Sequence, residues 1–79
     1  MTTREEVFSC MQQKLAELLA ISASSLTEAT PFSELSMTSR LFVQLITHLE
    51  DETDADLPFM KFKRCKTLGE ACDFIMEQL

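Results

Sequence analysis

The sequence contains no tryptophan and no tyrosine, one glycine and two prolines, although 46% of its residues are hydrophobic. So few chain-breaking residues in so apolar a chain indicate a compact helical domain rather than a disordered one. No apolar run approaches the roughly 20 residues that a membrane-spanning helix needs, and no signal peptide opens the chain. We therefore expect a soluble, cytoplasmic protein that does not act at a membrane.

Positive charge is also scarce. Seven basic residues oppose 13 acidic ones, and the net charge of −6 argues against nucleic acid as a partner, because phosphate binding requires a basic face. Four of the basic residues nevertheless lie within six positions that hold no acid: Lys61, Lys63, Arg64 and Lys66. Such a cluster is either a solvated face or a docking patch for proteins of complementary charge, and the sequence leaves both readings open.

Histidine and cysteine are too few and too scattered to indicate metal or acid–base chemistry. The single histidine is His48, and the spacing of Cys10, Cys65 and Cys72 matches no metal-binding motif. Unpaired thiols fit a reducing compartment. Cys10 and Cys72 fall on or beside apolar stripes, where cysteine acts as a small hydrophobe. With no convergent set of acids and bases, the sequence does not predict an enzyme.

A chain of 79 residues makes one domain, residues 1–79, and its apolar spacing predicts helices. The first helix should start at Thr2 or Thr3, where the side chains of Thr3 and Glu6 form a capping box. Its one-sided apolar stripe ends near Ala20.

A long loop, residues 21–36, follows this helix and leads to a second helix that begins at Thr38 or Ser39, with Thr38 able to cap it. The loop should be pinned across the helices by its spaced apolar side chains, which are Ile21, Leu26, Phe32 and Leu35.

An acidic turn over residues 50–56 then leads to a short helix that starts at Leu57-Pro58, and a second capping box, Thr67 to Glu70, precedes the last helix. The predicted fold is an all-α, small four-helix bundle with three longer helices and one short one. The predicted inward-facing residues are Val7, Phe8, Met11, Leu15, Leu18 and Leu19; Phe42, Val43, Leu45, Ile46 and Leu49; Phe59, Met60 and Phe62; and Leu68, Ala71, Cys72, Ile75, Met76 and Leu79.

Ser39 lies where the polar loop gives way to the second helix. On its own, a serine at a helix start is more simply explained as a plain N-cap. The stretch Thr30-Pro31-Phe32-Ser33-Glu34-Leu35-Ser36-Met37-Thr38-Ser39, however, resembles the threonine-proline-x-x-x-leucine-glycine-x-aspartate-serine approach to the modified serine of the acyl and peptidyl carrier protein family. Further matching pieces follow in order and spacing: Val43, Leu45, Ile46, Leu49, Glu50, Leu57-Pro58, Thr67-Leu68-Gly69 and Asp73-Phe74-Ile75.

This resemblance runs without an evident gap from about Thr30 to Ile75 and implies a bundle of acyl-carrier-protein type. It also implies that 4′-phosphopantetheine from coenzyme A is attached to Ser39 through a phosphodiester, and that the domain is a carrier rather than an enzyme. The implied partners are a phosphopantetheinyl transferase, an acyl-loading ligase or acyltransferase, and a ketosynthase or other condensing or tailoring enzymes. We expect a monomer.

Two further groups of residues take predicted roles once Ser39 is regarded as the attachment site. Partner recognition is predicted for the residues around the serine, which are Met37, Thr38, Arg40 and Leu41. Four residues should line the space between the last three helices: Val43, Ile46, Phe62 and Leu68. In relatives that space can shelter an acyl chain. In a domain this small the same residues also serve as plain core, which we favour.

The departures from the family pattern bear on the pathway. Thr38 stands at the usual aspartate, Ser36 at the usual glycine, and Arg40 at a position that is commonly Leu or Met; Gln44 replaces a frequent acid, and the short helix is basic. These changes argue against a fatty-acid carrier, whose enzymes read an acidic second helix. They favour a stand-alone carrier of a polyketide, nonribosomal peptide or related specialised pathway. An aminoacyl or peptidyl carrier and an unmodified, carrier-like interaction module remain the alternatives.

Overall fold

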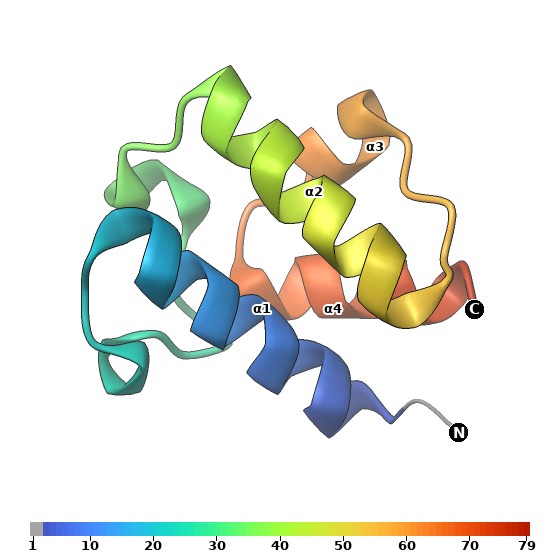
Figure 1. Cartoon of the computed structure of the whole chain (residues 1–79), viewed down its shortest axis with the longest axis horizontal. Coiled ribbons are helices and arrows are strands. Elements are labelled where there is room, and N and C mark those ends of the chain that lie inside the picture. Colours follow the sequence, from blue (N-terminus) through green and yellow to red (C-terminus); the bar gives the residue numbers. More distant parts are fainter. Residues whose placement is uncertain (1–2) are drawn as a thin grey trace.

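The computed structural model describes residues 3–79, which form four α-helices (Figure 1). The helices are α1 (Arg4–Leu19), α2 (Ser39–Thr53), α3 (Phe59–Lys63) and α4 (Leu68–Glu77), and two 3₁₀ turns, η1 (Ala23–Ser25) and η2 (Phe32–Leu35), lie between α1 and α2. Helix α1 packs against α2 and α4, and α3 packs against α2 (Figure 1). The predicted all-α bundle of three longer helices and one short helix is confirmed. Within residues 3–79, no helix is long and apolar enough to cross a membrane.

Helix α1 begins and ends close to the predicted residues. Thr3 is its N-cap, and the Thr3 hydroxyl accepts a hydrogen bond from the backbone N–H of Glu6 at 3.2 Å. The capping box is incomplete, because the Glu6 carboxylate accepts from the Thr3 hydroxyl rather than from a backbone amide. The helix ends at Leu19, and its C-cap residue, Ala20, adopts a left-handed conformation. The alternative start at Thr2 lies outside the described residues.

The segment between α1 and α2 is fixed to the helices, as predicted, mostly through buried side chains and backbone hydrogen bonds. Leu26 and Phe32 are buried, and Leu35 packs against the core. The N–H of Phe32 donates to the carbonyl of Lys66 at 2.9 Å. The prediction for Ile21 was wrong: its side chain is exposed, because it directly follows the end of α1 at the surface.

Helix α2 extends further than predicted, to Thr53, so the first part of the expected acidic turn is helical. The buried Thr53 hydroxyl donates to the carbonyl of Leu49 at 2.6 Å and accepts from the N–H of Ala55 at 3.3 Å. The Glu50 carboxylate accepts from the N–H of Leu57 at 3.0 Å. These bonds satisfy polar groups at the helix end, which is why the chain can turn here toward α3.

Three residues predicted to face the core are exposed instead. Val43 is 51% exposed and Met60 63%, and Leu79 lies beyond the end of α4. On α2 the covered arc is centred on Phe42, Ile46 and Leu49, and Val43 falls one helical step outside it. On α3 only residues one turn apart share a face, so Phe62 is buried and Phe59 half-buried, whereas Met60 points away.

Candidate functional site

The exposed serine predicted as the functional residue lies in the first turn of α2. Thr38 precedes it in an extended conformation and is the N-cap: its hydroxyl accepts from the N–H of Leu41 at 3.2 Å, and its carbonyl accepts from the N–H of Phe42 at 3.0 Å. Ser39 is therefore not the cap, and the simple explanation of this serine as an N-cap does not hold. The predicted start of α2 and the capping role of Thr38 are confirmed.

The Ser39 side chain is free to react. It is exposed, and its hydroxyl makes no hydrogen bond with any of residues 3–79. The backbone N–H groups of Ser39 and Arg40 belong to the first turn and likewise have no acceptor within the described chain. Free amides and the positive end of the helix dipole favour an anion at this position. The junction thus offers an accessible hydroxyl in surroundings suited to a phosphate ester.

A sharp turn in the backbone directs the chain into α2. Ser36 adopts a left-handed conformation, with φ of 52° and ψ of 44°. This conformation is unstrained for glycine and costs an L-residue roughly 1–2 kcal/mol. Ser36 occupies the position at which the family pattern has glycine, the residue that adopts this conformation without strain.

The residues predicted for partner recognition gather around Ser39. Thr38 and Arg40 are exposed, whereas Met37 and Leu41 are half-buried. A hollow of about 260 Å³ adjoins this segment and is lined by Phe32, Ser33, Ser36, Met37, Phe42 and Lys63. The sequence showed Lys63 as part of a basic cluster, but its position beside the Ser39 segment was not predicted.

The four residues predicted to line an internal space do not all do so. Ile46, Phe62 and Leu68 belong to one buried cluster, but Val43 lies on the surface. Aromatic rings fill this part of the core: the Phe62 centroid lies 6.0 Å from that of Phe32. The core role that we favoured for Ile46, Phe62 and Leu68 agrees with this packing, and their contact with a cargo stays a prediction.

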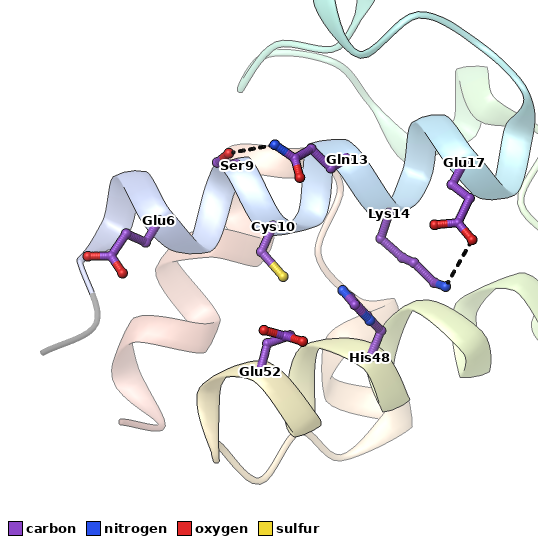
Figure 2. Close-up of a pocket in the computed structure, with 8 residues that line it drawn as sticks. All are labelled: Glu6, Ser9, Cys10, Gln13, Lys14, Glu17, His48 and Glu52. Carbon is purple, nitrogen blue, oxygen red and sulfur yellow. Dashed lines mark hydrogen bonds and ion pairs between the residues drawn. The ribbon is translucent and has the colours of Figure 1, made fainter.

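Another hollow, of about 480 Å³, lies between α1 and α2 and does not include Ser39 (Figure 2). Cys10, His48 and Glu52 point into it from the two helices (Figure 2). Partial burial, and then the charge of Glu52, raises the pKa of the Cys10 thiol, so the reactive thiolate is disfavoured. Within residues 3–79, no group of three or more histidine, cysteine or acidic side chains is placed to hold a metal ion. We assign this hollow no chemistry.

Comparison with known proteins decides the family. Residues 11–75 match the family model described as "Phosphopantetheine attachment site". The match covers most of the chain. The chain belongs to this family. It is 32% identical over 74 residues to an acyl carrier protein of Lactobacillus acidophilus, covering 92% of each chain. It is also 32% identical over 75 residues to an acyl carrier protein of Saccharopolyspora erythraea, covering 94% of this chain and 79% of that protein.

The family assignment confirms the resemblance seen in the sequence. An acyl carrier protein of Rubrobacter xylanophilus is a further relative, 31% identical over 75 residues. This phosphopantetheine-attachment domain is thus a carrier protein, and its cofactor is covalently attached 4′-phosphopantetheine.

Proposed function

We propose that Ser39 carries the 4′-phosphopantetheine and that the domain delivers acyl groups, held on the thiol of this cofactor as thioesters, to a series of enzymes. One observation carries the assignment of Ser39. Because the adjacent Thr38 caps α2, the Ser39 hydroxyl at the same helix start is exposed and has no hydrogen-bond partner within residues 3–79. A side chain needed for the fold would be engaged in it.

The proposed attachment uses the Ser39 hydroxyl as the nucleophile. Its oxygen forms a bond to the phosphorus of coenzyme A that bears the pantetheine, and adenosine 3′,5′-bisphosphate leaves. No imidazole or carboxylate hydrogen-bonds to Ser39 within residues 3–79, so we assign the base that takes the hydroxyl proton to the transferase. The free amides of Ser39 and Arg40 and the α2 dipole then stabilise the negative charge of the phosphodiester.

The surroundings of Ser39 fit this anionic group. Arg40 follows it directly and is exposed, and Lys63 lines the adjoining hollow with Ser36 and Met37. Between Glu28 and Glu50 the sequence contains a single acid, Glu34. The local charge is therefore positive although the chain as a whole is acidic.

We assign the cargo and the partners only by chemical class and enzyme class, whereas the attachment site is assigned to a single residue. The named relatives are acyl carrier proteins, which supports an acyl cargo over an aminoacyl one. The proposed partners are a phosphopantetheinyl transferase, an acyl-loading ligase or acyltransferase, and condensing or tailoring enzymes. The domain is a substrate of these enzymes and itself catalyses no step. Arg40, the neutral Gln44 and the basic α3 support a specialised pathway over fatty-acid synthesis.

Mass spectrometry of the intact protein tests the attachment site. The protein is incubated with coenzyme A, Mg²⁺ and a broad-specificity phosphopantetheinyl transferase, beside Ser39→Ala and the matched control Ser33→Ala. Ser33 is an exposed serine in the same approach segment. Wild type and Ser33→Ala should each gain one phosphopantetheine, and Ser39→Ala none. A mass gain in Ser39→Ala would show that the cofactor is attached at another residue. The absence of a mass gain in wild type with several transferases would favour the unmodified interaction module.

A further inference from the structure

The cations of this protein fall into two groups that differ in their pairing. The chain has seven lysine and arginine residues. Arg4 lies 2.7 Å from the Glu28 carboxylate and 3.0 Å from that of Asp73, and Lys14 lies 3.7 Å from that of Glu17. The other five cations form no ion pair within residues 3–79. Whether a cation forms an ion pair thus depends on where it lies, because all five cations without one lie on α3, just after α3, or at the start of α2.

Four of these unpaired cations lie beside Ser39 or along the approach to it, and we call them the basic rim: Arg40, Lys63, Arg64 and Lys66. Lys63 lines the hollow beside Ser36 and Met37. All three cations from Lys63 to Lys66 line a second hollow, of about 440 Å³. The two hollows share Phe32, Ser33 and Lys63, so they adjoin one another. The fifth cation, Lys61, lines neither of these hollows and is not included; together with Arg64 it lines a third hollow that also holds acidic residues of α4.

Within residues 3–79, Lys63 is the one member of the basic rim whose charge contacts another side chain: its ammonium lies 5.6 Å from the centroid of the Phe59 ring. All four are exposed, and none of them forms an ion pair with the described residues. An enzyme acting on a group attached to Ser39 must cover the surface around that residue, which includes the adjacent Arg40 and, beside Ser36 and Met37, Lys63. Arg64 and Lys66 extend this positive surface through the adjoining hollow. Complementary charge across such a surface speeds association, whereas like charge opposes it.

We propose that the enzymes acting at Ser39 dock on the basic rim through acidic surfaces around their active-site entrances. This inference rests on the proposed function, because it takes Ser39 as the point that these enzymes approach. The sequence left open whether the basic cluster is a solvated face or a docking patch. For its members Lys63, Arg64 and Lys66 the proposal selects docking, with an acidic protein face as the partner.

Two phosphopantetheinyl transferases serve as probes, one chosen for an acidic rim around its active-site cleft and the other for a basic rim. Binding is measured with the Ser39→Ala protein, which cannot be modified at that position. The acidic-rim transferase should bind at least about tenfold more tightly at low salt. The preference should shrink above 0.1 M salt, where the screening length falls below about 10 Å.

Two further variants, made in the Ser39→Ala background, separate the rim from overall charge. The first neutralises the rim on the α3 side with Lys63→Gln, Arg64→Gln and Lys66→Gln, and it should lose the preference. The second has the same net charge but adds acids at exposed positions away from this segment, and it should keep the preference. Its substitutions are Gln13→Glu, Ser24→Glu and Gln78→Glu.

Equal binding of the two transferases, tighter binding to the basic-rim enzyme, or an equal loss in both charge variants would overturn the docking proposal. The mass gain of the wild-type protein reports on attachment separately. A binding preference without a mass gain would support the docking surface and contradict the proposed attachment at Ser39. A mass gain without a binding preference would support the attachment and contradict the docking surface.

Discussion

Replacing Phe62 with alanine should remove the contact that fixes α3 against the start of α2. Phe62 is fully buried. Its ring centroid lies 6.0 Å from that of Phe32, 6.5 Å from that of Phe42 and 6.5 Å from that of Phe74. These three rings belong to η2, the first turn of α2 and α4. One side chain therefore joins the approach to Ser39, the helix that Ser39 begins, and the last helix.

The expected loss is large relative to the stability of so small a domain. Truncating a buried Phe to Ala costs roughly 3–5 kcal/mol, and each lost aromatic pair adds about 0.5–1.5 kcal/mol beyond burial. We expect about 4 kcal/mol, since part of the cavity can collapse. A domain of this length has a free energy of unfolding of about 4–12 kcal/mol. Phe62→Ala should therefore lose between about a third and all of the free energy of unfolding, whereas Phe62→Leu should retain most of it.

Urea denaturation followed by far-ultraviolet circular dichroism measures this loss, since the chain has no tryptophan to report by fluorescence. Met60→Ala is the matched control, because Met60 lies on the same short helix and is 63% exposed. It should cost less than about 0.5 kcal/mol. If Phe62→Ala cost less than about 1 kcal/mol, or no more than Met60→Ala, the account of Phe62 as the central contact would be wrong.

Two further predictions concern the helix cap and the buried thiol. Thr38→Ala should lower the free energy of unfolding by about 1 kcal/mol, because the N–H of Leu41 loses its acceptor, whereas Thr38→Ser should not; equal urea midpoints for the two variants would contradict this. Burial is the main cause that raises the pKa of the Cys72 thiol from 9.0 to about 11. The unfolded chain therefore ionises first, so stability should fall as pH rises from about 9 to about 11. The fall should be smaller in Cys72→Ala, and equal pH dependence would refute it.

The helices and their ends were predictable because their signals are local. The stripe of Val7, Met11 and Leu15 repeats at helical spacing, and the hydroxyls of Thr3 and Thr38 cap helices that begin one residue later. Each of these features depends on residues within one or two turns. Sequence spacing contains that information in full.

The exposure of Val43 and Met60 was not predictable in the same way. An apolar residue at the edge of a stripe is covered only if a neighbouring helix reaches it, and that depends on how α1 and α3 pack on α2. The position of Lys63 beside Ser36 and Met37 has the same origin. It joins residues from α3 and the approach to α2, and no spacing rule links them.

The departures around Ser39 change the charge of the junction, and the chain still forms a turn and a helix cap there. Threonine and aspartate both serve as N-caps, so Thr38 keeps the capping role that the family's aspartate could fill while removing a negative charge. Ser36 adopts a left-handed conformation, which the family's glycine would adopt without strain. Arg40 adds a positive charge where Leu or Met is common. Because this chain forms both the turn and the cap that precede Ser39, the departures bear mainly on charge, and through charge on which enzyme surfaces the proposed docking would select.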